Sequence, residues 1–296
     1  MKNNKIYLWL LVLAVFTSCQ QNTEKAAAYG NFEAVEVIVS AETAGKMLLL
    51  NAEEGQNYHK GELTGLVDTT SLWLQKQQLE QQKAAILSRL SALKAQLKVQ
   101  DQQLENSQRD QARIHQLFEN NAATAKQKDD IDGAVELIKA QRQAIIAQFD
   151  GVQKETQVVQ AQISQLNESI RKSHITQPLD GTVLAKYVEA GEIVAPGKAL
   201  YKTADLSFLD LKAYITGIQL TDFILNQEVK VLIDGSNDAI ELPGTISWIA
   251  SSAEFTPKTI QTKEERTDLV YAIKVRVGND GRLKIGMPGE VHLINH

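Results

Sequence analysis

The chain is short of proline, cysteine and basic charge, and each shortage narrows the class of protein it can be. Its five prolines all lie beyond residue 177, at positions 178, 196, 243, 257 and 288. Because proline is the strongest helix breaker, the first 177 residues permit a very long uninterrupted helix. The single cysteine, Cys19, excludes a disulfide framework and a zinc knuckle. A net charge of −5, with no basic patch interleaved with aromatic residues, argues against a nucleic-acid binder.

Motifs of enzymatic chemistry are also missing. The five histidines, at 59, 115, 174, 292 and 296, have no metal-ligand spacing. There is neither a GxSxG nucleophile elbow nor a GxxxxGK phosphate loop. His115 follows an apolar heptad position and is expected on a helix surface. The sequence therefore predicts a protein that is not an enzyme and has no metal or cofactor.

The N-terminus carries an export signal. Two lysines precede an apolar run over residues 6–16, and Thr17 and Ser18 lead to Cys19. A basic start, a short apolar run and small residues are typical of a secretory signal, here residues 1–18. The run is too short to span a bilayer, which needs about 20 apolar residues. Residues 19–33 are expected to form a polar tether.

The small residues before Cys19 resemble the bacterial lipobox, in which the cysteine becomes the lipidated first residue of the mature protein. Phe16 departs from the leucine that is commoner at that position of the lipobox. The alternative is a buried cysteine in an uncleaved signal anchor. Both interpretations place the rest of the chain across the membrane.

A glycine pattern occurs twice, with about a hundred residues between the copies. Gly45, Gly55 and Gly61 recur 136 positions later as glycines, namely Gly181, Gly191 and Gly197. Short β-like stretches alternate with these glycines, which we expect in turns. One copy of about 30 residues is too small to bury a core, whereas two can close a sandwich. The copies are assigned to residues 34–68 and 174–205.

Between the copies, residues 69–173 show two long heptad patterns. Apolar residues recur at alternating steps of three and four, which is the coiled-coil signature. The pattern breaks at the predicted tip, residues 118–125, where Asn120 and Asn121 suit a helix end and Thr124 with Gln127 forms a capping box. Arms of about 48 residues give an antiparallel hairpin about 70 Å long.

The first arm has polar residues at heptad positions where a helix pair would favour leucine. They are Gln100, Ser107 and Gln111. Two interpretations stay open: the distal hairpin is kept soft, or this face is kept for another subunit.

Residues 206–296 have the pattern of an antiparallel β-barrel. Val229, Val231 and Ile233 alternate with other residues, and a second period-2 run covers residues 271–277. Glycines, including those of "GMPGE" (286–290), separate the runs.

Taken together, the two half-motifs and the hairpin resemble the membrane fusion protein family, also called HlyD-like periplasmic adaptors. The stretch "ITQPLDGTVLAKYVEAGEIVAPGKALYKTADL" (175–206) is similar to the second half-motif of that family. The stretch "AEFTPKTIQTKEERTDLVYAIKVRV" (253–277) is similar to the barrel segment of members that work with ATP-binding-cassette exporters. The resemblance implies a multidomain α+β fold: a split lipoyl-like β-sandwich interrupted by a helical coiled-coil hairpin and followed by a β-barrel.

The resemblance also implies a function. Such a protein is a periplasmic adaptor of a Gram-negative bacterium that couples an inner-membrane ATP-binding-cassette exporter to a TolC-type outer-membrane channel. It forms a homo-oligomeric ring, with six copies expected. The inner membrane is favoured for its lipid, and the outer membrane is the alternative. Six residues follow "GMPGE", so no further membrane-proximal domain is expected, which disfavours a resistance-nodulation-division pump as the partner.

Three residues near the tip resemble the docking motif of the family, an Arg, a Leu and a Ser. They are Arg113, Leu117 and Thr124. Thr124 stands in place of the Ser of the motif and keeps its hydroxyl group. The arginine guanidinium can donate two charge-assisted hydrogen bonds to acceptors on the channel, and the leucine side chain can fill an apolar pocket. The alternative is a solvated Arg113, a core Leu117 and a Thr124 that acts only as the helix cap.

Rival functions come from other classes. A biotin- or lipoate-carrying enzyme domain needs a modified lysine on the turn that joins its two halves; here the hairpin occupies that joint, so Lys46 and Lys186 are expected to be ordinary strand lysines. A structural coiled-coil lipoprotein would explain the heptads but not the split β module. An adaptor for a major facilitator or resistance-nodulation-division pump is a further alternative.

Overall fold

The computed structural model describes residues 27–235, 239–255 and 269–294, which form an antiparallel barrel, a two-sheet sandwich and a helical hairpin. This confirms the predicted fold class. The barrel belongs to one compact unit, and the sandwich with the hairpin belongs to another. The signal, Cys19 and residues 256–268 of the quoted barrel segment lie outside the described residues.

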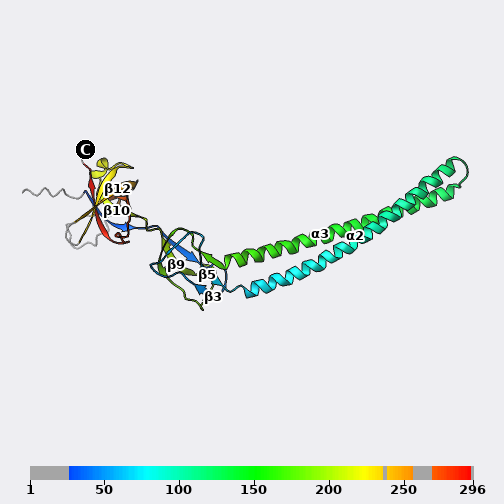
Figure 1. Cartoon of the computed structure of the whole chain (residues 1–296). Coiled ribbons are helices and arrows are strands. Elements are labelled where there is room, and N and C mark those ends of the chain that lie inside the picture. Colours follow the sequence, from blue (N-terminus) through cyan, green and yellow to red (C-terminus); the bar gives the residue numbers. More distant parts are fainter. Residues whose placement is uncertain (1–26, 236–238, 256–268, 295–296) are drawn as a thin grey trace, which may run out of the picture. The chain divides into compact units, whose positions relative to one another are not determined.

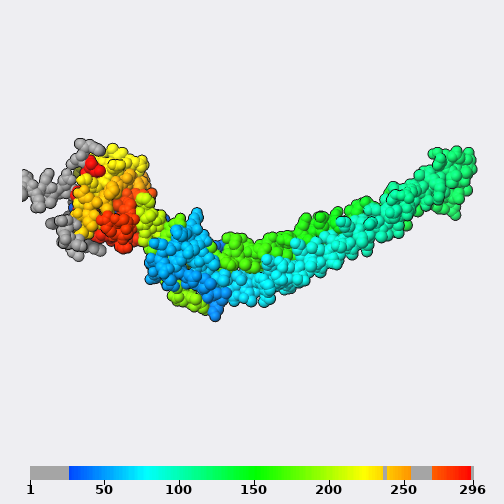
Figure 2. All heavy atoms as spheres, viewed as in Figure 1, coloured from blue at the N-terminus to red at the C-terminus, as the bar shows by residue number. Residues whose placement is uncertain are grey.

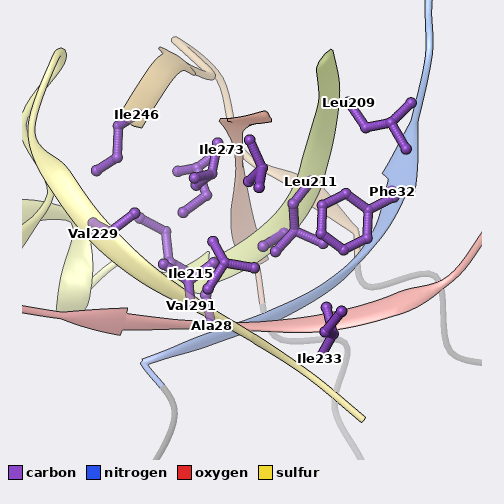
Figure 3. Close-up of a cluster of buried hydrophobic side chains, with 14 of the residues drawn as sticks. Ala28, Phe32, Leu209, Leu211, Ile215, Val229, Ile233, Ile246, Ile273 and Val291 are labelled. Carbon is purple, nitrogen blue, oxygen red and sulfur yellow. The ribbon is translucent and has the colours of Figure 1, made fainter. Parts of the chain in front are cut away.

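The barrel is closed by six strands. They are β1 (Ala28–Glu33), β10 (Phe208–Thr216), β11 (Glu228–Ile233), β12 (Ile240–Ile249), β14 (Leu269–Gly278) and β15 (Pro288–Leu293). The order is β10-β1-β15-β11-β12-β14, and antiparallel pairing of β10 with β14 closes the ring. A short strand, β13 (Glu254–Phe255), pairs with β14, and a 3₁₀ turn, η2 (Gln219–Asp222), follows β10. Alternate residues of the strands point inward and fill the core (Figure 3).

Strand β1 corrects the predicted tether of residues 19–33. Ala28 and Phe32 are 1% and 0% exposed, and β1 pairs with β10 on one side and β15 on the other. Without β1, these two strands would each present an unpaired edge. Gly30 permits the close approach, since a Cβ there would lie 1.9 Å from the Lys212 carbonyl oxygen.

The sandwich interleaves the two glycine-containing copies. One sheet has the order β2 (Glu36–Ser40), β9 (Ala199–Ala204), β7 (Gly181–Lys186), β4 (Asn57–Tyr58), and the other β6 (His174–Thr176), β5 (Leu63–Val67), β3 (Gly45–Leu50), β8 (Ile193–Val194). Each sheet therefore contains two strands from each copy. Neither copy can complete a sheet or the shared core alone, which explains why the chain contains both.

Hydrogen bonds repeat this relation between the copies. The Gly55 amide donates to the Val183 carbonyl at 2.9 Å, and the equivalent Gly191 amide donates to the Met47 carbonyl at 2.7 Å. Gly55, Gly61, Gly191 and Gly197 have φ values of 82°, 85°, 99° and 86°. These left-handed turns suit glycine, which lacks the Cβ that would clash.

Gly45 and Gly181, which were expected in turns, instead begin strands β3 and β7. Their φ values are not positive, and the space around them explains why they are glycines. A Cβ on Gly45 would lie 2.7 Å from Val67 Cγ1, and one on Gly181 would lie 2.4 Å from the Ala204 carbonyl oxygen. Both positions therefore favour glycine because of close packing.

The hairpin consists of α2 (Thr70–Glu119) and α3 (Ala125–Lys172), which run antiparallel side by side from the sandwich to the tip (Figure 1). At its base, Asp68 Oδ1 accepts a hydrogen bond from the Thr70 amide at 2.8 Å, and the Ser173 carbonyl accepts one from the Val67 amide at 2.9 Å. These bonds join both helix ends to the sandwich. No helix in the described ranges is long and apolar enough to cross a membrane.

Candidate docking site at the hairpin tip

The turn at the tip ends α2 through a left-handed asparagine. Asn121 has a φ of 57°, its amide donates to the Phe118 carbonyl at 3.0 Å, and the Ala122 amide donates to the Leu117 carbonyl at 2.8 Å. These two bonds form a Schellman motif, which satisfies carbonyls that the helix end leaves free. The helix end predicted at Asn120 and Asn121 is confirmed.

Thr124 begins α3 as the predicted capping box. Its Oγ1 accepts a hydrogen bond from the Gln127 amide at 3.3 Å, and Gln127 Oε1 accepts one from the Thr124 amide at 2.8 Å. The Thr124 hydroxyl also donates to Gln127 Oε1 at 3.1 Å. The hydroxyl is thus engaged in the cap, and Thr124 shapes the tip turn.

The two other motif residues differ in what they contact. Arg113 is on the exposed surface, and its Nη2 lies 2.8 Å from Asp110 Oδ1 on the same helix. An exposed ion pair of this kind is weak, so Arg113 is able to exchange partners. Leu117 is 40% exposed although it is a leucine next to the packed stripe of α2. The tip therefore offers an apolar side chain and, four residues before it, a guanidinium.

Phe118 is a candidate that the sequence did not single out. The heptad pattern places it in the packed stripe, but it is 38% exposed because α2 ends one residue later. Lys128 Nζ lies 6.0 Å from the centre of its ring, a weak cation–π contact. A heptad residue in the last turn of a helix has few partner residues to pack against. Its place in the last turn could therefore have indicated that Phe118 is exposed.

Below the tip, a polar cluster joins the helices around Asp132. Gln111 Nε2 donates to Asp132 Oδ1 at 2.6 Å, and His115 Nε2 lies 2.7 Å from the same oxygen. Lys128 Nζ is 3.8 Å from Asp132 Oδ2. The hydrogen bond from Gln111, followed by the contacts with His115 and Lys128, lowers the pKa of Asp132. This cluster, of Gln111, His115, Lys128 and Asp132, is called the Asp132 cluster below.

The Asp132 cluster gives part of the polar heptad positions a role. Gln111 faces a carboxylate of α3, and further from the tip Arg142 Nε donates to Asp101 Oδ1 at 2.5 Å. His115, expected on the helix surface, is a member of this cross-helix network. Gln100 differs, because its buried Oε1 has no hydrogen-bond partner in the part of the chain that the structure describes.

Lys186, one of the two strand lysines of the rival carrier function, is paired with carboxylates. Lys186 Nζ lies 3.0 Å from Glu53 Oε1 and 2.9 Å from Glu189 Oε2, and its side chain is only 11% exposed. The hydrogen bond with Glu189 raises the pKa of Lys186, so this lysine is held as a charged strand residue. Within the described ranges, no group of three His, Cys, Asp or Glu residues can hold a metal ion.

Two relatives align with this chain over most of their length. No family model matches it. A "UPF0194 membrane protein" of Yersinia pseudotuberculosis (strain YPIII) is 27% identical over 296 residues, which cover 91% of this chain and 89% of the relative. A UPF0194 membrane protein of Acidithiobacillus ferridurans is 27% identical over 308 residues, covering 94% of this chain and 90% of the relative.

Two solved structures have the same architecture. MacA from Actinobacillus actinomycetemcomitans has a TM-score of 0.59 at 21% identity, over 89% of this chain and 76% of MacA. The membrane fusion protein Spr0693 from Streptococcus pneumoniae R6 has a TM-score of 0.58 at 14% identity, over 90% of this chain and 99% of Spr0693. These matches confirm the resemblance drawn from the half-motifs, at the level of the fold.

Proposed function

We propose that this chain, which has the fold of the membrane fusion proteins, is a non-enzymatic periplasmic adaptor. It couples an inner-membrane ATP-binding-cassette exporter to a TolC-type outer-membrane channel. The observation that carries the proposal is the tip: a capped, hydrogen-bonded turn that holds Leu117 and Phe118 exposed at the far end of a 48- to 50-residue helix pair. Figure 2 shows the atoms of this helix pair, coloured from cyan to green, as they continue to the tip.

The tip residues have separate roles in docking. Leu117 is the apolar anchor, since a leucine buried at an interface contributes far more than one in the solvated rim. Arg113 exchanges Asp110 for a carboxylate or backbone acceptor on the channel. Two charge-assisted hydrogen bonds from its guanidinium contribute more binding energy at a buried interface than an exposed ion pair does. Thr124 fixes the turn through its capping box and so positions Leu117.

The other end of the bridge rests on two sequence features. Residues 253–277 are similar to the barrel segment of adaptors that serve ATP-binding-cassette exporters, and Cys19 would carry the lipid that holds the chain at the inner membrane. Several copies would form a ring, with six expected, in which the hairpins make a conduit. A ring also gives a use to exposed apolar residues along the helices, such as Val99 and Val158.

The proposal is tested by purification of the tagged full chain from its native membranes in a gentle detergent, followed by mass spectrometry. An exporter permease with its ATPase and an outer-membrane channel are expected to co-purify. If a major facilitator carrier is recovered, that carrier, and not an ATP-binding-cassette exporter, is the inner-membrane partner. Recovery of neither membrane partner, or of carboxylase or dehydrogenase subunits, would contradict the adaptor function.

A variant separates the two ends of the bridge. Leu117→Asp is expected to lose the channel, by at least tenfold in recovered peptides, and to retain the exporter, because a charge replaces the apolar anchor. Leu137→Asp is the matched control, since Leu137 is a 60% exposed leucine on α3 away from the tip. Retention of the channel by Leu117→Asp would contradict docking through the tip.

A further inference from the structure

One end of the barrel presents aliphatic side chains to solvent. The loop between β10 and β11, residues 217–227, exposes Ile218 (90%), Ile224 (66%) and Leu225 (54%). Leu269, 55% exposed, begins β14 beside this loop, since its neighbour Val270 pairs with Thr216 at the end of β10. Ile218, Ile224, Leu225 and Leu269 are called the end patch. Large exposed aliphatic residues gathered at one end of a domain are typical of a binding surface.

The loop holds these side chains outward by a folded structure. Phe223 is 4% exposed in the barrel core, and Leu220 packs against the same core. The Ile224 amide donates to Gln227 Oε1 at 2.9 Å, and the Asn226 amide donates to the Ile246 carbonyl at 2.9 Å. The neighbours of the exposed residues are thus fixed, and the end patch is not a product of a frayed loop.

The N-terminal segment enters the barrel at this same end. Gln219 Nε2 donates to the Ala27 carbonyl at 2.8 Å, and the start of β1 lies beside the end of β10, where Tyr29 pairs with Tyr214. Only residues 20–26 separate Ala27 from Cys19. At about 3.5 Å per residue, a lipid on Cys19 keeps Ala27 within about 28 Å of the bilayer.

We propose that the end patch inserts into the headgroup and upper acyl region of the bilayer and turns this end of the barrel toward the membrane. The inference rests on the lipid anchor of the proposed function, which brings the end patch within reach of the bilayer. Asp222 is the only charged residue of the loop, so the loop itself has no basic group for anionic headgroups and contacts the bilayer through apolar side chains. The lipid holds the protein at the membrane, and the end patch orients it.

The test places a fluorophore at the end patch. Cys19 is the only cysteine of the chain, and its thiol is blocked when it carries the lipid. Ile218→Cys therefore gives the lipidated full chain one site for an environment-sensitive label, and the unsubstituted chain should take up no label. The labelled protein is incorporated into phosphatidylethanolamine–phosphatidylglycerol vesicles with and without a nitroxide-bearing lipid that quenches on contact.

The matched control is Ile285→Cys. Ile285 is also exposed, at 40%, and it lies at the other end of the barrel, because the next amide, that of Gly286, donates to the Phe32 carbonyl near the end of β1. Quenching at position 218 is expected to exceed quenching at position 285 at least threefold. Adding Ile224→Asp and Leu225→Asp should remove that excess while the protein still floats with the vesicles.

Three results would overturn the inference. Equal quenching at positions 218 and 285 in protein that floats would remove the lipid contact and leave the anchor standing. Protection of position 218 in native membranes alone, with no quenching in protein-free vesicles, would assign the end patch to a protein partner. Failure to float, with label taken up by Cys19, would remove the anchor of the proposed function and this inference with it.

Discussion

The sandwich and the distal hairpin differ in how many fully buried apolar residues stabilise them. The sandwich surrounds a cluster of twelve buried apolar residues drawn from both copies, including Met47, Val67, Leu200 and Tyr201. The hairpin has an apolar cluster, of Ile86, Val152, Val159 and Ile163, only in the part nearer the sandwich. Nearer the tip, Val135 is buried, whereas other apolar heptad residues, such as Leu104 and Ile145, are only half-buried. Polar contacts, as in the Asp132 cluster, also join the helices there.

The difference separates a stable sandwich from a hairpin tip with fewer buried apolar contacts. Strands that alternate between copies make the sandwich a cooperative unit, in which no half can open without the other. A helix pair with few buried apolar contacts belongs to the low end of the local stability range. The tip is therefore able to adjust to the channel proposed as its partner while the base stays fixed.

The largest effect is expected in the shared core of the sandwich. Leu200→Ala should lower the free energy of unfolding by about 2–5 kcal/mol, because it leaves a cavity between strands of both copies. Urea unfolding of the full chain measures this change. Leu48→Ala is the control, since Leu48 is 50% exposed in the same module and should change stability by less than about 0.5 kcal/mol. Equal losses would show that the two copies do not share a tight core.

A smaller effect is expected from the polar contact inside that core. The Tyr201 hydroxyl donates to Gln177 Oε1 at 3.0 Å and lies 2.9 Å from Thr64 Oγ1, and burial raises the pKa of Tyr201. Tyr201→Phe should cost about 1–3 kcal/mol, because buried polar atoms lose a partner. Tyr187→Phe, at a 44% exposed position, is the control in the same unfolding experiment. A loss no greater than in that control would contradict a structural role for the Tyr201 hydroxyl.

In the distal hairpin the effect should be local. Asp132→Asn weakens the bonds to Gln111, His115 and Lys128, so amide hydrogen exchange should become several-fold faster between residues 108 and 136 and stay unchanged in the sandwich. Asp130→Asn removes the same charge from an exposed position of the same helix turn and should leave exchange near its original rate. Faster exchange in the sandwich as well would show that the tip is not a separate unit.

The smallest effect is the pH dependence of the Asp132 cluster. The folded-state pKa of Asp132 lies below its ordinary value of 3.8, chiefly through the hydrogen bond from Gln111. The stability from this carboxylate is therefore present above pH 3.8 and is lost as the pH falls through the lower folded value. A carboxyl NMR titration should give a midpoint below 3.8, and Gln111→Ala should raise it. A midpoint at or above 3.8 in the unsubstituted chain would contradict the cluster.

What the sequence predicted well were local signals. The helix cap at Thr124 and the left-handed Asn121 depend on residues a few positions apart, and both are present. Strand β1 was missed because its pairing is long-range, with Tyr29 opposite Tyr214, and a six-residue stretch cannot reveal such a partner. The alternation of copies between the two sheets was hidden for the same reason.

The Asp132 cluster was missed for a different reason. Heptad analysis assigns apolar positions and gives no partner to a glutamine at a heptad position or to a histidine beside one. Gln111 and His115 are four residues apart, as are Lys128 and Asp132, so each pair lies on one helix face. Only the antiparallel register of α2 and α3 brings the two pairs together.

The central claim, that Leu117 docks on an outer-membrane channel, is tested most directly by photo-crosslinking in living cells. A photoreactive amino acid at position 117 is compared with the same residue at position 137, and the products are identified by mass spectrometry. If Leu117 docks on the channel, position 117 should give a crosslink to a TolC-type channel and position 137 should give none. The same crosslinks from both positions, or none to a channel from position 117, would contradict it.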